Sequence, residues 1–197
     1  MKKRINNEMD VVFLLDRSGS MSGIENDTIG GYNSYIDSQK GKNVKVTTIL
    51  FDDKYEVLSD REDVNNIKKL TNKEYYVRGC TALLDAIGKT IKTLESKNPN
   101  KVMFFITTDG YENASKEYNK SQIKELIESH KDWKFMYIGA DIDSYSEGAN
   151  IGITEDNIAN YRKSSKGVTK LFSALSSASE CYYENNELKK SWKNELE

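Results

Sequence analysis

The chain has very few of the residues that usually report redox or soft-metal chemistry. It contains two cysteines, one histidine and one proline in 197 residues. Whether Cys80 and Cys181 pair is left open by the sequence, but two isolated cysteines in a chain of this length are typical of free thiols in a reducing compartment. With no cysteine or histidine at ligand spacing, a zinc or copper site is not expected.

The chain also lacks a large excess of either charge and has no long apolar run. Lysine and arginine number 29 against 31 acidic residues, and the net charge of −2 predicts no general attraction to nucleic acid or anionic lipid. The start, residues 1–4, is basic, but the apolar run that follows spans only residues 11–15 and ends at Asp16. Such a run is too short for a signal sequence or a membrane span. We therefore expect a cytoplasmic protein with no nucleic-acid partner and no membrane partner.

The remaining composition is that of a folded domain. Charged residues make up 30% of the chain and the mean hydropathy is −0.71, which indicates a well-solvated surface. The apolar residues are clustered, and this argues against disorder. The length suits one domain with a substantial core. We predict a single domain over residues 1–197, with a core at about 8–182 and a charged C-terminal helix or tail at 183–197.

Apolar runs and stripes of helical spacing alternate along the chain. The runs are typical of strands buried on both faces, and the stripes are typical of helices that pack on a sheet. The predicted core strands are 11–15, 44–51, 101–107 and 133–139, and the predicted helices are 24–39, 81–97, 121–130 and 168–182. This order predicts an α/β, Rossmann-like fold with a doubly wound, mostly parallel central sheet and helices on both faces.

Several shorter segments complete this expectation. A turn at 52–54 leads back into an antiparallel edge strand at 55–58. The other predictions are a short helix through 64–70, an extended piece at 75–77, a helical turn at 143–150 and a final edge strand at 157–161. Thr81 and Ser121 are expected to cap the helices that they precede. The pair Gly30 and Gly31 costs a helix about 1 kcal/mol per glycine, so we expect a packing reason for it.

Three polar segments lie where predicted strands end or helices begin. Residues 16–20 (Asp-Arg-Ser-Gly-Ser) follow the first strand, residues 79–81 precede a helix, and residues 107–110 follow a later strand. In doubly wound sheets, ligands bind beyond the carboxyl ends of the strands, where the strand order reverses. If the two strands are neighbours at that point, Asp16 and Asp109 meet at one edge of the sheet.

The side chains of these segments carry hard oxygen donors. Carboxylate and hydroxyl oxygens suit Mg²⁺, Mn²⁺ or Ca²⁺. Ser18 and Ser20 alternate along their loop, so both hydroxyls can turn toward one point beside Asp16. Thr81 supplies a third neutral oxygen. The candidate metal ligands are Asp16, Ser18, Ser20, Thr81 and Asp109.

This pattern resembles the von Willebrand factor A (vWA) domain and its metal-ion-dependent adhesion site, in the bacterial single-domain form. That site has Asp-x-Ser-x-Ser after the first strand, a threonine before a helix and an aspartate after the fourth strand. The resemblance covers nearly the whole chain. It implies that Ser18, Ser20 and Thr81 bind the metal directly and that Asp16 and Asp109 act partly through water.

The resemblance also implies a function. We expect a divalent-metal-dependent adhesion or adaptor module, and not an enzyme. Its cofactor would be Mg²⁺, with Mn²⁺ or Ca²⁺ as alternatives, and an open coordination position would take an Asp or Glu side chain of a partner protein. Two alternatives stay open: a scaffolding domain without metal, and a Mg²⁺-dependent phosphotransferase of the haloacid-dehalogenase type. The latter requires a second aspartate where this chain has Ser18.

Other conspicuous residues have simpler interpretations. We expect the acidic side chain of Asp85, in the first turn of its helix, to interact favourably with the helix dipole. We expect the same of His130 at the C-terminus of its helix. Asp52 and Asp53 are interpreted as parts of a hairpin turn. The motifs for a serine-hydrolase elbow and for nucleotide-binding glycine loops are missing from the sequence.

Overall fold

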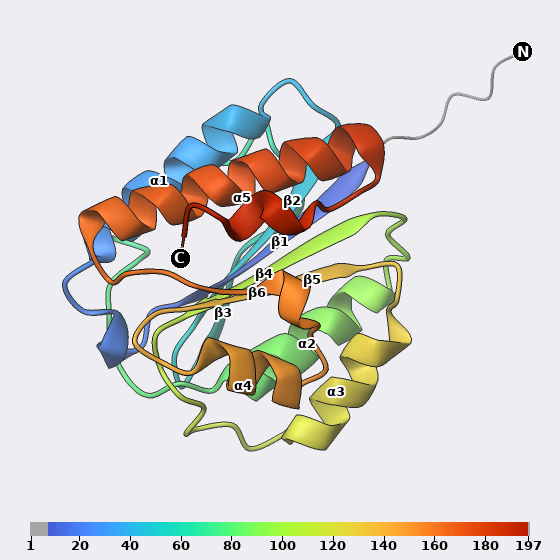
Figure 1. Ribbon diagram of the computed structural model, residues 1–197. Coiled ribbons are helices and arrows are strands. Elements are labelled where there is room, and N and C mark those ends of the chain that lie inside the picture. Colours follow the sequence, from blue (N-terminus) through green and yellow to red (C-terminus); the bar gives the residue numbers. More distant parts are fainter. Residues whose placement is uncertain (1–7, 197) are drawn as a thin grey trace, which may run out of the picture.

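A six-stranded sheet runs through the middle of the computed structural model, which describes residues 8–196 (Figure 1). The strand order is β3-β2-β1-β4-β5-β6, and β3 is antiparallel to β2 while the other pairs are parallel. The strands are β1 (Met9–Asp16), β2 (Val44–Phe51), β3 (Tyr55–Asp63), β4 (Val102–Thr108), β5 (Lys134–Gly139) and β6 (Ile158–Asn160). The predicted fold class is confirmed.

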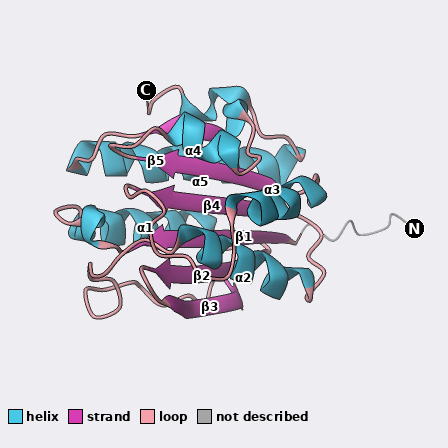
Figure 2. Cartoon of the chain, turned by 90° about the horizontal axis from the view of Figure 1, so that it is seen from below, coloured by secondary structure: helices cyan, strands magenta, loops and turns pink. Residues whose placement is uncertain are grey.

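The two strands that carry the predicted acids are neighbours. β1 pairs with β4 in parallel, with a register from Asp10 opposite Val102 to Leu15 opposite Thr107. Every residue of both strands is buried, as their continuous apolar runs predict. From β1 the chain first builds β2 and β3 on one side and then crosses to β4 on the other, so the strand order reverses between β1 and β4 (Figure 2).

Five α-helices cover the two faces of the sheet within the described residues. One face carries α1 (Glu25–Gln39) and α5 (Ser165–Asn185), and the other carries α2 (Leu83–Glu95), α3 (Lys120–Ser129) and α4 (Ser144–Asn150) (Figure 1). Alternate side chains of β1 enter different cores: Phe13 packs on the α1 and α5 side, and Val12 packs on the α2 side. The sheet is therefore buried on both faces.

The glycine pair in α1 has a packing reason at one of its two positions. A Cβ atom on Gly31 would lie 2.1 Å from Cδ2 of Phe172 in α5, whereas a Cβ on Gly30 would meet nothing within 4 Å. Gly31 thus allows α1 and α5 to approach closely, and the cost of glycine in the helix is offset by this contact.

One segment is less regular than predicted. Residues 64–66 form a turn and residues 67–70 have no regular structure, so the predicted short helix is absent. The side-chain amide of Asn33 accepts a hydrogen bond from the Leu70 backbone N–H at 2.8 Å and donates one to the Leu70 carbonyl at 2.9 Å. These bonds satisfy the backbone N–H and carbonyl of Leu70 without a helix. The side chains of Val64 and Leu70 still pack in the core.

Both predicted helix caps were wrong. α2 begins at Leu83, after Thr81, and its first turn is capped from another loop: the Leu84 backbone N–H donates to the Glu112 carboxylate at 2.9 Å. The α3 helix begins at Lys120, and Asn119 caps it through a reciprocal capping box with Gln122. Asparagine caps helices as well as serine does, and Gln122, three residues later, completes the capping box with Asn119.

The C-terminal segment is also more ordered than the predicted tail. α5 extends to Asn185, and a 3₁₀ turn follows at Lys190–Lys193. Trp192 is buried there and donates from its indole N–H to the Asp156 carbonyl at 2.9 Å. The predicted helix or tail at 183–197 therefore includes a turn that one aromatic side chain anchors.

Two further expectations concern cysteines and membranes. Cys80 and Cys181 are free thiols and form no disulfide with each other. In residues 8–196, none of the helices has the length and apolar character needed to cross a bilayer.

Candidate metal-binding site

Asp16 is the last residue of β1 and its carboxylate is held at both oxygens. Oδ1 accepts the Ser18 backbone N–H at 2.6 Å, and Oδ2 accepts the Thr108 hydroxyl at 2.6 Å. Burial raises the pKa of Asp16 to about 6, and the nearby charge of Asp109 adds to this, while the bonds from Thr108 and Ser18 oppose it. The carboxylate is thus fixed between the ends of β1 and β4.

The two serines of the loop after β1 meet as predicted. Their Oγ atoms lie 2.9 Å apart. The loop is tightened by a 3₁₀ turn at Gly19–Met21, and the Gly19 N–H donates to the Gly79 carbonyl at 3.2 Å. This bond joins the serine loop to the loop that carries Thr81.

Gly110 shows that three hydroxyls surround one point. A Cβ atom built on Gly110 would lie 2.7 Å from Oγ1 of Thr81, 2.8 Å from Oγ of Ser20 and 3.5 Å from Oγ of Ser18. These hydroxyls come from two separate loops, yet they converge on the residue after Asp109. The space at this point is too small for a side-chain methyl group and is bordered by oxygen atoms.

Asp109 is the least satisfied carboxylate of this region. Its side chain is 1% exposed, and among the described residues neither carboxylate oxygen accepts a hydrogen bond. The ammonium group of Lys163 lies 2.9 Å from Oδ2 as an ion pair, and it also donates to the Ser20 carbonyl. A buried carboxylate without hydrogen bonds requires a cation nearby, so this position favours positive charge.

The residues at this edge fit a hard divalent cation. Ser18, Ser20 and Thr81 supply converging hydroxyls, and Asp16 and Asp109 flank them from the ends of β1 and β4. In residues 8–196, no three His, Cys, Asp or Glu side chains gather as a metal cluster. A cation here would therefore rest largely on neutral hydroxyl oxygens, which are ligands that Mg²⁺ and Ca²⁺ accept.

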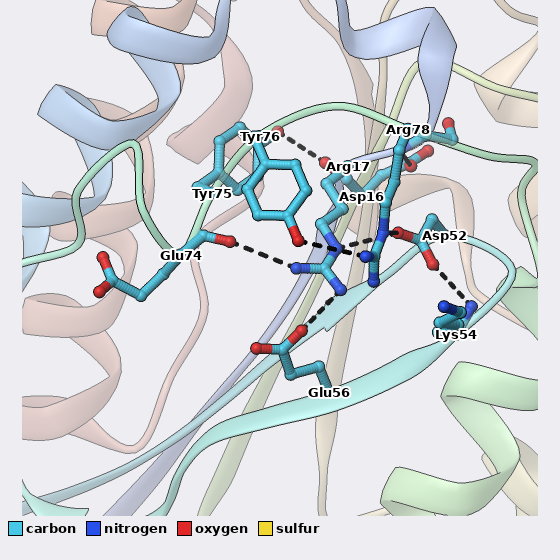
Figure 3. A network of polar contacts seen from close by, with 10 residues as sticks. Asp16, Arg17, Asp52, Lys54, Glu56, Glu74, Tyr75, Tyr76 and Arg78 are labelled. Carbon is cyan, nitrogen blue, oxygen red and sulfur yellow. Dashed lines mark hydrogen bonds and ion pairs between the residues drawn. The ribbon is translucent and has the colours of Figure 1, made fainter.

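Sequence reasoning missed a cluster of charged residues beside the site (Figure 3). Arg17 and Asp52 are fully buried, and the Arg17 Nε donates to Oδ2 of Asp52 at 3.0 Å. Arg78 donates to the same oxygen at 2.6 Å. Asp52 follows β2 and was interpreted only as part of a turn. The signal available in the sequence was Arg17, which lies between the predicted metal ligands Asp16 and Ser18.

The loop after Asp109 is held against α2 by Asp85. The Asp85 carboxylate accepts backbone N–H groups of Lys116, Glu117 and Tyr118, each at 2.9 Å. Burial alone would raise the pKa of Asp85, but these three donors outweigh it and hold the pKa below its ordinary value. Asp85 is an acid of the first turn, as predicted, and its carboxylate also connects α2 to the loop after Asp109.

Other polar features lie away from this edge. The lone histidine, His130, ends α3, and its Nε2 lies 3.2 Å from the Glu95 carboxylate. A hollow of about 510 Å³ is lined by His130 and Trp133, just before β5 begins, and so at the opposite edge of the sheet. Neither feature adds to the candidate site.

Comparison with known families gives one match that covers about half of the chain. The family model described as von Willebrand factor type A domain matches residues 11–112. This range contains Asp16, Ser18, Ser20, Thr81 and Asp109. No curated protein matches the chain in sequence.

Solved structures show the same fold at low identity. Proximal thread matrix protein 1 from the mussel byssus, with a zinc-occupied MIDAS motif, has a TM-score of 0.67 and 15% identity over 87% of this chain and 46% of its own. The manganese-loaded TRAP protein of Plasmodium vivax has a TM-score of 0.62 and 19% identity, covering 85% and 74%. The vWF domain of the type V pili tip protein Mfa5 from Porphyromonas gingivalis has a TM-score of 0.69 and 10% identity, covering 92% and 98%. The chain spans less than half the length of the mussel structure.

Proposed function

Because this chain belongs to the von Willebrand factor type A domain family, we propose that it is a divalent-metal-dependent protein-binding module, an adhesion or adaptor domain. Ser18, Ser20 and Thr81 would hold the metal directly, and Asp16 and Asp109 would act partly through water. Mg²⁺ is the proposed metal, with Mn²⁺ or Ca²⁺ as alternatives. The cytoplasmic location stays a prediction from the two free cysteines.

The observation that carries this proposal is the convergence of three hydroxyls beside a buried carboxylate that already attracts a cation. Ser18, Ser20 and Thr81 surround Gly110, and the buried carboxylate of Asp109, the residue before it, forms an ion pair with Lys163. Hydroxyls do not neutralise a divalent cation. The bound ion would keep much of its charge and attract a further anionic oxygen.

We propose that this further oxygen comes from an Asp or Glu side chain of a partner protein. The partner's carboxylate would complete the coordination shell, and contacts around it would supply the remaining affinity. The solved structures of the same fold described above include a pilus tip protein, which supports a role in protein interaction. We propose no enzymatic activity: the position at which a haloacid-dehalogenase-like enzyme needs an acid is occupied by Ser18, whose hydroxyl contacts Ser20.

The first test is metal binding by the isolated protein. Metal-stripped protein is titrated with Mn²⁺ by calorimetry and by electron paramagnetic resonance. The double variant Ser18→Ala, Ser20→Ala should lose binding and keep its circular dichroism spectrum. Ser22→Ala is the matched control, because Ser22 lies in the same loop but its hydroxyl is not among the three that surround Gly110. Equal Mn²⁺ affinity in the wild type and the double variant would refute the proposed site.

The second test is partner capture from a lysate with Mg²⁺ and with excess EDTA. A captured partner is then changed at single Asp or Glu residues to Asn or Gln. One such change should abolish binding that depends on metal. Binding that survives EDTA would show that capture does not use the metal.

A further inference from the structure

Two arginines next to the site share a single buried carboxylate oxygen (Figure 3). The Nε atoms of Arg17 and Arg78 lie 3.0 Å and 2.6 Å from Oδ2 of Asp52. Arg17 and Asp52 are completely buried, and Arg78 is 33% exposed. The cost of removing charged groups from water offsets much of their mutual attraction, so a buried cluster of this kind adds little to the stability of the fold. Its placement suggests that it instead sets the positions of the loops around it.

The cluster joins three loops at the carboxyl ends of the strands. Arg17 lies between Asp16 and Ser18, Asp52 follows β2, and Arg78 lies in the loop before α2. The ring of Tyr76 faces both guanidinium groups, at 5.5 Å from Arg17 and 5.3 Å from Arg78. These contacts hold the loop of Arg78 against the serine loop.

Backbone hydrogen bonds carry this connection to Thr81. The Arg78 N–H donates to the Arg17 carbonyl at 2.8 Å, and the Ala82 N–H donates to the Asp52 carbonyl at 2.8 Å. Thr81 therefore lies between two backbone anchors on residues of the cluster. The segment from 74 to 82 contains no helix or strand, so these contacts, together with the bonds of the Thr81 backbone to Asn113 and Ala114, set its position.

We infer that Arg78, paired with Asp52 and Arg17, is a positioning residue that directs the Thr81 hydroxyl toward the metal. This inference rests on the proposed metal-binding function and extends it to residues that do not touch the ion. Residues that orient metal ligands typically change metal affinity by about 10- to 100-fold when they are removed. We expect Arg78→Met to weaken Mn²⁺ binding by about tenfold.

A double-mutant cycle tests whether Arg78 acts through Thr81. Mn²⁺ affinity is measured for the wild type, Arg78→Met, Thr81→Ala and the double variant, well below their melting temperatures. Arg78→Met should weaken binding in the wild-type background and have little further effect once Thr81→Ala has removed the hydroxyl. Equal losses in both backgrounds, or no loss in either, would overturn the inference.

Arg61→Met is the matched control. Arg61 is 23% exposed and forms an ion pair with Asp10 at 2.5 Å, near the start of β1 and so at the opposite edge of the sheet. Its loss should leave Mn²⁺ affinity unchanged. Arg78→Lys keeps the charge without the planar guanidinium and should weaken binding less than Arg78→Met. If Arg78→Met does not fold, Arg78→Lys is used in its place.

Hydrogen exchange in metal-free protein gives a readout that does not depend on binding. Arg78→Met should speed exchange of the Ala82 and Gly19 amides, whose acceptors are the Asp52 and Gly79 carbonyls. Arg61→Met should leave both unchanged. Unchanged exchange in Arg78→Met would overturn the inference. A wild-type protein that binds no Mn²⁺ would instead overturn the proposed function, while the exchange data would still decide whether Arg78 positions this loop.

Discussion

The ammonium nitrogen of Lys163 lies 2.9 Å from Oδ2 of Asp109, one of the carboxylates that flank the candidate site. Lys163 comes from the segment just before α5, and it also donates to the Ser20 carbonyl. A side chain of this chain thus supplies positive charge where a divalent cation is proposed. The lysine and the cation would compete for the same carboxylate.

Replacing Lys163 should therefore strengthen metal binding. Two like charges about 4 Å apart repel by about 1 kcal/mol in water and by more near a protein surface, and 1.4 kcal/mol corresponds to a factor of ten in affinity. We expect Lys163→Met to tighten Mn²⁺ binding by roughly tenfold in calorimetric titrations. Lys166→Met, an exposed change in the first turn of α5, is the control. Weaker binding in Lys163→Met would contradict the competition.

Gly110→Ala should abolish metal binding and leave the fold intact. The new methyl carbon would lie 2.7 Å from the Thr81 hydroxyl and 2.8 Å from that of Ser20, so it would fill the point on which these oxygens converge. Gly30→Ala is the control, because a Cβ there meets nothing within 4 Å, and it should stabilise α1 by about 0.5–1 kcal/mol. Unchanged Mn²⁺ affinity in Gly110→Ala would mean that the metal lies elsewhere.

Asp85→Asn should lower the free energy of unfolding in a way that depends on pH. The Asp85 carboxylate accepts three backbone N–H bonds, and its pKa is lowered in the folded state. The ionised group therefore stabilises the fold at pH values above its ordinary pKa of about 4, and this contribution is lost as pH falls through the lower folded pKa. Urea unfolding should show a difference of about 1–3 kcal/mol between wild type and Asp85→Asn at pH 7.

That difference should shrink as the pH falls from about 4 toward the lower folded pKa, because Asp85 then takes up a proton, first in the unfolded chain and at lower pH in the folded protein. Asp60→Asn serves as the control, since Asp60 is exposed and forms an ion pair with Lys97 at the surface. A difference between wild type and Asp85→Asn that stays constant from pH 7 to pH 3 would rule out this role of the carboxylate.

The sequence was sufficient to predict the sheet and the meeting of the candidate residues at one edge of it, because both depend on local patterns. The apolar runs of β1 and β4 are continuous, and each ends at the residue or loop that carries an acid. Parallel strands place their carboxyl ends at the same edge. The spacing of Ser18 and Ser20 was also readable in the sequence, and their hydroxyls lie 2.9 Å apart.

The parts that sequence reasoning missed depend on contacts between distant residues. Asp52 is 35 residues from Arg17 and 26 from Arg78, and no local pattern joins them. The cap of α2 likewise comes from Glu112, 28 residues after Leu84. Such long-range side-chain bonds replace local capping, and only the folded arrangement of the loops shows them.

The most direct measurement of the central claim is a crystal structure of the protein with Mn²⁺, with the metal located by its anomalous scattering. We predict one strong peak within about 2–2.5 Å of the hydroxyl oxygens of Ser18, Ser20 and Thr81, with the carboxylates of Asp16 and Asp109 on its flanks. A well-ordered site with no peak, or a peak that none of these three hydroxyls contacts, would contradict the account.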